Sequence, residues 1–358
     1  MTHKTTGMIS GIALACAMGT AASAQDFRFS MAIIAGENSV YYEDIARPFA
    51  DLVAQMTDGR VQIDILTAGT VGSVLRLHEA VQDGLVDMAQ TTPIFLGTAD
   101  PVDAIIASFP TGLGVDSYLP WLYFSGGEEL WREHRRERMG LEALVTGLGP
   151  SELFAHSNVA VRNAEDLEGL RFRALGNWAA ILQEFYGVSP TVVAGSEIYG
   201  MLERGGIDLA EYSTPNENLK VGFHEVAEYI IYPGFHAPAW AFETVMLPET
   251  WESLPADIQA QMELAAELVT YRSLGRMMVD DLDAMAEYES MGNEIIRLDD
   301  EFMEDAREKS REWARREAEA ASDGDYDLPM RLVDSVFGFQ DHWRANSYYL
   351  VTDTQDRP

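Results

Sequence analysis

Asp166-Leu-Glu-Gly-Leu-Arg-Phe-Arg173 opens the stretch that decides the fold, and this stretch continues to Asn216. Short runs of alternating polarity or of apolar residues predict strands here, and longer segments with apolar residues at helical spacing predict helices. The expected elements are, in order, a strand at 170–174, a helix at 178–186, a strand at 190–194, a helix at 197–203 and a strand at 207–212. Strands that alternate with helices form a mostly parallel sheet, and ligands bind at the carboxyl ends of its strands. Arg173 stands at such an end, where a guanidinium can hold a carboxylate by two parallel hydrogen bonds.

Part of this pattern occurs a second time, earlier in the chain. Val81-Gln-Asp-Gly-Leu-Val-Asp-Met-Ala89 matches Leu202-Glu-Arg-Gly-Gly-Ile-Asp-Leu-Ala210 at equal spacing, each with a helix end, a glycine and a strand that carries an aspartate. The match predicts two α/β lobes of similar build joined by a hinge, although a helix, a glycine and a strand in succession are common in α/β proteins. The expected divisions are a leader at 1–24, a first lobe mainly from 25–150, a second lobe mainly from 151–250, and a region of long C-terminal helices at 251–358 that packs across the lobes or against a second subunit.

The N-terminus predicts a secretion leader, because Lys4 precedes a short apolar run and Ala22-Ser-Ala24 has the small residues of a cleavage site. The apolar run is too short to span a bilayer. Cys16 is the only cysteine and lies in the leader, so the mature chain is expected to lack disulfides, thiol chemistry and cysteine-bound zinc. A lipoprotein anchored through Cys16 is the alternative, which Ala13 disfavours because a larger aliphatic residue is usual there. Export without disulfides predicts the bacterial periplasm.

The charge balance restricts the partners. The 358 residues carry a formal net charge of −33, and loss of Lys4 with the leader makes the mature chain more negative still. A charge of this sign argues against nucleic acid and against anionic membranes as partners. If the ligand is an anion, its site must be locally positive against this background.

Signals for catalysis are weak. The sequence has no Gly-x-Ser-x-Gly elbow and no phosphate-binding glycine loop followed by lysine. His224-Glu-Val-Ala-Glu228 matches a zinc-binding helix only in its first half, because a glutamate replaces the second histidine. His78, His134 and His342 lie in helical contexts without ligand spacing and are predicted to be at the surface. Nothing here favours an enzyme.

Groups suited to binding are better represented. Arg173 either holds a ligand carboxylate or forms a salt bridge with one of the many acidic residues. Aromatic side chains at loops and element ends either wall a pocket or pack in the core; these are Trp178, Tyr212, Phe235, His236 and Trp240. Glu152 and Glu211, near predicted strand ends, could ligate a hard cation that bridges to an anionic ligand, or they could pair with Arg173.

Three segments resemble signatures of a known family. They are Arg60-Val-Gln-Ile-Asp-Ile65, Glu79-Ala-Val-Gln-Asp-Gly-Leu-Val-Asp-Met-Ala89 and Asp166-Leu-Glu-Gly-Leu-Arg-Phe-Arg173. The family comprises the extracytoplasmic solute-binding proteins of tripartite ATP-independent periplasmic (TRAP) transporters, the DctP-like family, and the resemblance covers nearly the whole mature chain. Trp121-Leu-Tyr-Phe-Ser-Gly-Gly-Glu-Glu-Leu-Trp131 and Tyr232-Pro-Gly-Phe235 are similar to the subgroup that binds α-keto acids.

The resemblance implies roles for particular residues. Arg173 is the arginine that pairs with the ligand carboxylate, Glu152 stands where the subgroup has a glutamine that helps hold ligand and metal, Glu211 matches a metal-binding glutamate, and Tyr212 stands at a tryptophan. His236-Ala237 departs from the subgroup, which carries a further glutamate there. One expected cation ligand is therefore replaced, which implies a different substrate or no bridging cation.

The resemblance implies a periplasmic protein that binds a small organic acid, namely an α-keto or hydroxy acid or an aromatic acid such as a hydroxybenzoate. It delivers this acid to membrane permease subunits, with Na⁺ or Ca²⁺ as a candidate bridging ion. The alternatives are an exported lyase or hydrolase that acts through Glu152 and Glu211, and a binding protein that serves a sensory receptor. The long C-terminal helices permit a homodimer.

Overall fold

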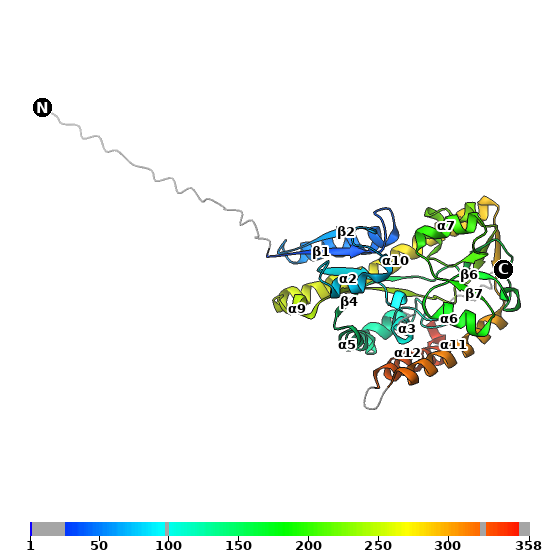
Figure 1. The fold of residues 1–358 in the computed structure, drawn as a ribbon. Coiled ribbons are helices and arrows are strands. Elements are labelled where there is room, and N and C mark those ends of the chain that lie inside the picture. The colour runs from blue at the N-terminus through cyan, green and yellow to red at the C-terminus, as the bar shows by residue number, and fades with distance from the viewer. Residues whose placement is uncertain (2–25, 97–99, 323–326, 351–358) are drawn as a thin grey trace.

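Two sheets form the centres of two lobes (Figure 1). The structure, a computed structural model, describes Met1 and residues 26–96, 100–322 and 327–350, so the expected leader lies outside it apart from Met1. The first sheet has the strand order β2(Val61–Leu66), β1(Phe27–Ile33), β3(Met88–Thr91), β10(Trp240–Met246) and β4(Glu142–Gly149). The second has the order β11(Glu294–Arg297), β9(Tyr229–Tyr232), β5(Ala155–Ser157), β8(Leu209–Ala210), β6(Arg171–Arg173) and β7(Ser189–Thr191). The α/β class and the two lobes are as predicted.

Helices surround both sheets. The first lobe carries a π-helical turn η1(Tyr41–Ala46), α1(Arg47–Met56), α2(Leu77–Gln82), α3(Pro101–Ala107), α4(Tyr118–Phe124) and α5(Gly127–Met139). The second lobe carries α6(Gly176–Phe185), α7(Gly195–Glu203) and α8(Pro215–Lys220). The C-terminal part adds α9(Pro248–Glu252), α10(Ala256–Met291), α11(Asp300–Ala321) and α12(Leu328–Asn346). None of the helices in the described ranges is both long enough and apolar enough to cross a membrane.

The predicted strand-helix unit around Arg173 is confirmed. β6, α6, β7, α7 and β8 follow one another in the expected order. Phe172 on β6 pairs in parallel register with Pro190 on β7 and with Leu209 on β8. Parallel pairing places the carboxyl ends of these strands at one edge of the sheet, and Arg173 lies at that edge.

The repeated helix-glycine-strand pattern has the same structure in both lobes. Gly84 follows α2 with φ of +68°, and Gly205 follows α7 with φ of +64°, a left-handed conformation that ends a helix. Asp87 accepts a hydrogen bond from the Ser30 backbone N–H of the neighbouring strand at 2.7 Å, and Asp208 accepts one from the Arg171 N–H at 2.7 Å. The two lobes are therefore built on the same local plan.

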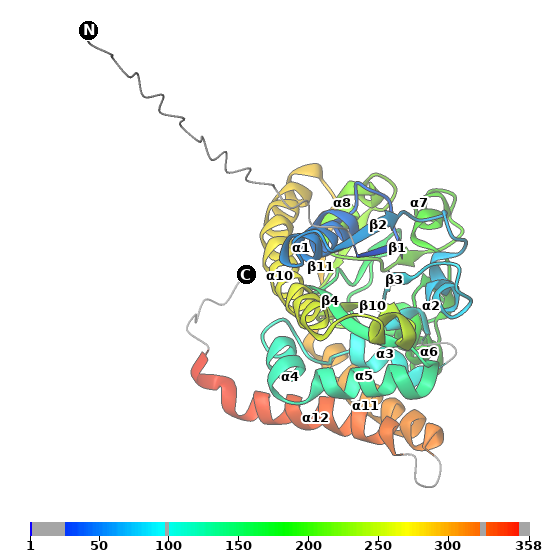
Figure 2. The ribbon, with the colours of Figure 1, turned by 90° about the vertical axis from the view of Figure 1, so that its left-hand side faces the viewer.

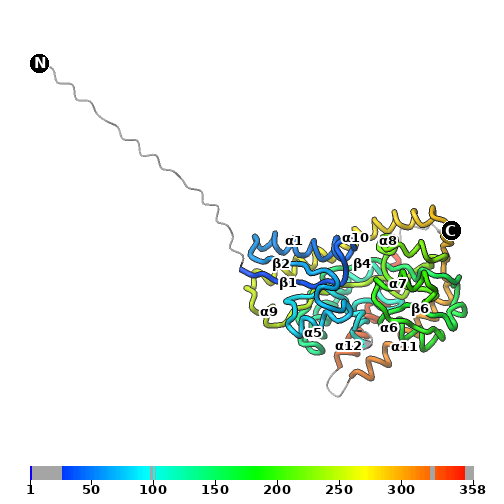
Figure 3. The backbone as a smooth tube through the Cα atoms, turned by 45° about the horizontal axis from the view of Figure 1, so that its top comes forward, coloured from blue at the N-terminus to red at the C-terminus, as the bar shows by residue number. Residues whose placement is uncertain are grey.

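α10 connects the lobes along their common side (Figure 3). Near its middle, Thr270 donates to the carbonyl of Val145 on β4 of the first sheet at 3.0 Å. Near its end, the Tyr288 hydroxyl donates to the carbonyl of Pro215 in the second lobe at 3.0 Å. α10 therefore makes hydrogen bonds with both lobes.

Two segments differ from the expected divisions. The predicted helical run from Pro255 to Ala321 is interrupted by β11, which pairs in parallel with β9 in the second sheet. β10, inside the range expected mainly in the second lobe, returns to the first sheet between β3 and β4. Both strands pair with partners distant in sequence, so local patterns did not reveal them.

Candidate functional site

A cavity of about 110 Å³ lies between the lobes, and both lobes supply its walls. Its apolar lining includes Ile34, Val74, Leu75, Ile94, Phe95, Leu175 and Phe242. Its polar and aromatic lining includes Tyr41, Glu152, Arg173, Asn177, Trp178, Glu211, Tyr212, His236 and Trp240. A cavity that joins apolar walls to a few converging polar groups is typical of a small-molecule site.

Arg173 lies in this cavity with only 2% of its surface exposed. Its Nη1 donates to the carbonyl oxygen of Glu211 at 2.7 Å and to the Glu211 carboxylate at 2.9 Å. Its Nε and Nη2 donate to the carbonyl oxygen of Val193 at 3.3 and 3.1 Å. A guanidinium has five N–H groups, and four of them donate to these carbonyl and carboxylate oxygens. Among the described residues, one hydrogen on Nη2 has no acceptor. The side chain thus offers its charge and a single donor, because Val193 engages the Nε/Nη2 edge and Glu211 engages both hydrogens of Nη1, so neither edge is free to make two parallel bonds.

Two carboxylates and an imidazole meet beside this guanidinium. One ligand atom from each of Glu152, Glu211 and His236 lies within 4.8 Å of the others. His236 Nε2 is 3.1 Å from a carboxylate oxygen of Glu152, and Glu211 also accepts the Leu175 backbone N–H at 2.7 Å. Burial raises the pKa of Glu211, and the charge of Glu152 adds to the rise, while Arg173 opposes it.

The charges of the cavity do not balance. Glu152, Glu211 and Arg173 are its charged lining residues in the described chain, so its formal charge is negative by one when His236 is neutral. A second negative charge from a carboxylate ligand would be costly in a buried site. The donor set is therefore suited to a cation, since carboxylate oxygens and imidazole nitrogen are common metal ligands.

Several buried polar atoms along the cavity have no hydrogen-bond partner within the described chain. They are both amide atoms of Asn177, the indole N–H groups of Trp178 and Trp240, Nδ1 of His236 and the hydroxyl of Ser108. Buried polar groups are almost always paired, so unpaired ones at a cavity point to a ligand that completes them. The indole groups donate only, which requires acceptor atoms on that ligand.

Most of the predicted site residues are brought together. Arg173, Glu152, Glu211, Tyr212 and His236 all line the cavity, and so do Trp178 and Trp240. The Tyr212 ring lies 5.9 Å from the guanidinium carbon of Arg173.

Phe235 differs from the expectation. It does not line the cavity, and its ring packs behind the wall against Phe154 and Phe302, at centroid distances of 5.4 and 5.0 Å. Sequence reasoning missed Asn177 and Tyr41. The position of Asn177, just after the strand that carries Arg173 and directly after Gly176, was the signal that could have found it.

Contacts between the lobes border the cavity. Glu217 of α8 accepts the Val40 backbone N–H at 3.0 Å, and the Tyr41 hydroxyl donates to Ser213 at 2.9 Å. Lys220 lies 3.0 Å from Glu43 and is more exposed than these. All three contacts join the start of η1 in the first lobe to the segment after β8 in the second.

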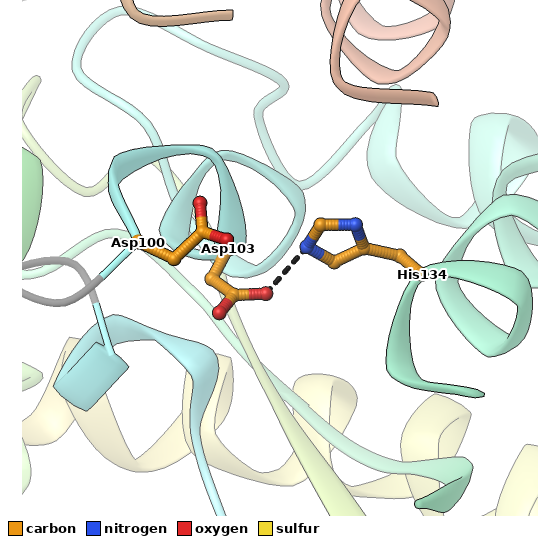
Figure 4. Close-up of side chains that lie close together, drawn as sticks. All are labelled: Asp100, Asp103 and His134. Carbon is orange, nitrogen blue, oxygen red and sulfur yellow. Dashed lines mark hydrogen bonds and ion pairs between the residues drawn. The ribbon is translucent and has the colours of Figure 1, made fainter. Parts of the chain in front are cut away.

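A second cluster of potential metal ligands, Asp100, Asp103 and His134, lies in the first lobe (Figure 4). Asp103 and His134 point toward one another, and Asp103 accepts from His134 at 2.5 Å and from Arg135 at 2.6 Å. Asp100 forms an ion pair with Arg138. Although burial raises the pKa of Asp103, the charges of Arg135 and His134 bring it well below its usual value. Cationic side chains already neutralise both aspartates, so this cluster is a set of ion pairs rather than a metal site.

The structure corrects the prediction that His78 and His134 are at the surface. They are only 1% and 0% exposed, whereas His342 is exposed as predicted. His78 lies 2.7 Å from Glu243, which also accepts from Arg135 at 2.8 Å. The helical context predicted that both side chains are exposed to solvent. Instead, His134 contacts a carboxylate of α3 and His78 contacts a carboxylate of β10.

Comparison with known proteins places the architecture in one family. The family model described as "Bacterial extracellular solute-binding protein, family 7" (DctP) matches residues 31–320. The monocarboxylate 2-oxoacid-binding periplasmic protein of a Nostoc species is 26% identical over 265 residues, which cover 74% of this chain and 72% of that protein.

Solved structures share the fold. A TRAP periplasmic solute-binding protein of Pseudoalteromonas atlantica with bound sodium and pyruvate has a TM-score of 0.83 and 25% identity, covering 92% of this chain and 99% of that one. A TRAP solute-binding protein of Bordetella bronchiseptica, a mixed-occupancy dimer with calcium and picolinate, has a TM-score of 0.82 and 22% identity, covering 90% and 96%.

Proposed function

Because the chain belongs to family 7 of the bacterial extracellular solute-binding proteins, we propose that it binds a small 2-oxo monocarboxylate between its lobes and delivers it to the membrane subunits of a TRAP transporter in the periplasm. Members of this family are solute-binding proteins, so the chain is a binding protein rather than an enzyme, and the lyase or hydrolase alternative has no support. A sensory role would use the same cavity, and a neighbouring permease gene would favour transport.

The observation that carries this proposal is the single buried guanidinium beside two carboxylates. Arg173 supplies charge and one N–H to the acid, and the indole groups of Trp178 and Trp240 supply donors to its remaining oxygens. Among the described residues that line the cavity, Arg173 is the only arginine or lysine, which disfavours a dicarboxylate. A 2-oxo monocarboxylate has one charge and three acceptor oxygens, which suits this set.

Cavity size favours the smaller candidates. An apolar cavity of about 150 Å³ is known to hold a benzene ring. The cavity here measures about 110 Å³, so a short-chain acid such as pyruvate fits better than a hydroxybenzoate. Apolar residues from both lobes, including Val74 and Phe242, would contact the alkyl part of the acid.

A bridging cation is part of the proposal. Glu152, Glu211 and His236 would hold it, since their ligand atoms lie within 4.8 Å of one another and the cavity has an excess negative charge. Such a cation would neutralise the carboxylates and attract the acid. The relatives that bind pyruvate with sodium and picolinate with calcium support this arrangement.

Thermal denaturation of protein stripped of metal tests the proposal. Pyruvate at about 100 times its dissociation constant, with a divalent cation present, should stabilise the fold by about 2.7 kcal/mol, a rise in melting temperature of roughly 5 °C. Chelation with EDTA should remove most of this rise. Succinate, 4-hydroxybenzoate and ectoine serve as comparison ligands, and the absence of stabilisation by any 2-oxo acid with any cation would contradict the proposal.

We also propose that the chain forms a homodimer through α10. Apolar or small residues on one face of this helix follow a 3–4 spacing, which is the pattern of a helix seam; they are Leu264, Leu268, Tyr271, Gly275, Met278 and Leu282. Tyr271 is 68% exposed and Leu282 is 66% exposed. Figure 2 shows α10 at the edge of the molecule. A second copy could present the same stripe, and a self-complementary surface is what a two-fold dimer requires.

Light scattering during size-exclusion chromatography tests the dimer. The protein should elute with twice the mass of one chain, and Tyr271→Glu should elute as a monomer because it places a charge in the seam. Leu85→Glu is the matched control, since Leu85 is 64% exposed but lies in the first lobe away from α10, and it should stay dimeric. A monomeric unsubstituted protein at roughly tens of micromolar would contradict the proposal.

A further inference from the structure

The third ligand atom of the proposed cation site is nitrogen, and its position is fixed. His236 is 5% exposed. Its ring stacks on Trp178 at a centroid distance of 6.1 Å and meets the edge of Phe154 at 5.8 Å. Between these two rings, the imidazole presents a nitrogen atom to the carboxylates of Glu152 and Glu211.

Unpaired polar atoms show that the site is built for an occupant. Nδ1 of His236 is buried without a partner in the described chain, and so are both amide atoms of Asn177, which is 3% exposed and lines the same cavity. Two glutamates by themselves would not define a metal site. A buried imidazole beside them and an unpaired amide that lines the same cavity indicate a ligand-filled coordination site.

The donor atoms discriminate between cations. Na⁺ and Ca²⁺ prefer oxygen ligands, and Ca²⁺ takes six to eight of them in flexible geometry. Imidazole nitrogen suits Zn²⁺, Cu²⁺, Fe²⁺ and Ni²⁺, and affinity for such mixed sites is lowest for Mn²⁺, rises to Cu²⁺ and is lower again for Zn²⁺. Two carboxylates and one imidazole also leave coordination positions of the metal open, and the carboxylate and 2-oxo oxygens of one acid can occupy two of them together.

We infer that this site selects a first-row transition-metal dication that imidazole favours, such as Zn²⁺, in place of the sodium or calcium bound by its structural relatives. The inference rests on the proposed function, because the metal and the acid share the cavity. His236 is the residue that sets the selection. The protein therefore links uptake of the acid to a supply of transition metal in its compartment.

Isothermal titration of metal-stripped protein with Zn²⁺, Mn²⁺, Ca²⁺ and Na⁺, each with pyruvate present in excess, tests this inference. Zn²⁺ should bind at least about tenfold more tightly than Ca²⁺, and more tightly than Mn²⁺. His236→Glu supplies a third carboxylate and should reverse this order. His236→Gln supplies a neutral oxygen and should reduce Zn²⁺ affinity at least about tenfold, which guards against a fold defect in the charged variant.

A spectroscopic readout is independent of affinity. Electron paramagnetic resonance of the Mn²⁺ complex should show coupling to one nitrogen nucleus, and His236→Gln should lose it. The inference is overturned if Ca²⁺ binds as tightly as Zn²⁺. It is also overturned if His236→Glu and His236→Gln both keep the original preference between Zn²⁺ and Ca²⁺. In either case the proposed binding of the acid still stands. Zn²⁺ binding that does not depend on His236 shows an ion held elsewhere and overturns it too. Failure of pyruvate to bind with any of the four cations contradicts the proposed function itself.

Discussion

Arg173→Ala lowers the affinity for pyruvate by on the order of 100-fold or more. Removing one partner of a buried, hydrogen-bonded charge pair costs about 2–5 kcal/mol, and each 1.4 kcal/mol is about a factor of ten. The loss leaves Glu211 and the acid with no guanidinium between them. Arg173→Lys keeps the charge but cannot reach the carbonyl oxygens of both Val193 and Glu211, so it also weakens binding. Calorimetric titration in the presence of the cation measures both effects.

The matched control is on the same strand. Arg171, two residues before Arg173 on β6, is 47% exposed in its side chain and pairs with Asp208 outside the cavity. Arg171→Ala should bind pyruvate as the unsubstituted protein does. Because an uncompensated Glu211 could unfold the alanine variant, Arg173→Met combined with Glu211→Gln is compared with Glu211→Gln alone, and the double variant should bind pyruvate more weakly than the single one. Unchanged affinity in Arg173→Ala would show that the guanidinium does not contact the acid.

Arg135→Leu lowers the free energy of unfolding by about 3–5 kcal/mol, the usual cost of removing one partner from a buried ion pair. Arg135 is fully buried and is hydrogen-bonded to both Asp103 and Glu243. Its loss leaves two carboxylates in the core of the first lobe without their guanidinium. Urea denaturation measures the change, since the free energy of unfolding falls linearly with denaturant.

An exposed arginine provides the control for this change. Arg315 pairs with Asp334 at 2.9 Å, and their side chains are 48% and 60% exposed. Surface pairs contribute about 0–1 kcal/mol, so Arg315→Leu should have little effect. Adding Asp103→Asn and Glu243→Gln to Arg135→Leu should restore part of the stability. Equal stability of the Arg135 and Arg315 variants would mean that the buried ion pairs are not what stabilises this lobe.

Local sequence patterns predicted the central unit of the second lobe. Alternation marked β6, and Gly205 marked the end of α7, because both signals depend on near neighbours in the chain. β11 has only four residues between two long helices, and its pairing with β9 is what makes it a strand. β10 joins the first sheet by pairing with β3 and β4. Such long-range pairing leaves little trace in the residues themselves.

The same limit applies to the site. Arg173, Glu152 and Glu211 were predicted near strand ends from local order, and this order allowed the two glutamates to pair with Arg173 or to bind a cation. The resemblance gave His236 only as a replacement for an expected cation ligand, so its place beside Glu152 and Glu211 was not predicted. Burial of His78 and His134 depends on carboxylates supplied by other elements. The sequence could not show whether Phe235 lines the cavity or packs in the core, because a phenylalanine after a turn can do either.

The hydrogen bonds that join η1 to the segment after β8 involve only protein groups. Val40, Tyr41 and Glu43 meet Glu217, Ser213 and Lys220 irrespective of which acid occupies the cavity. These hydrogen bonds therefore slow the dissociation of every bound acid by the same factor. The residence times of different acids should differ only through the contacts that each acid makes in the cavity. The Lys220–Glu43 contact is exposed, so salt screens it and shortens all residence times together.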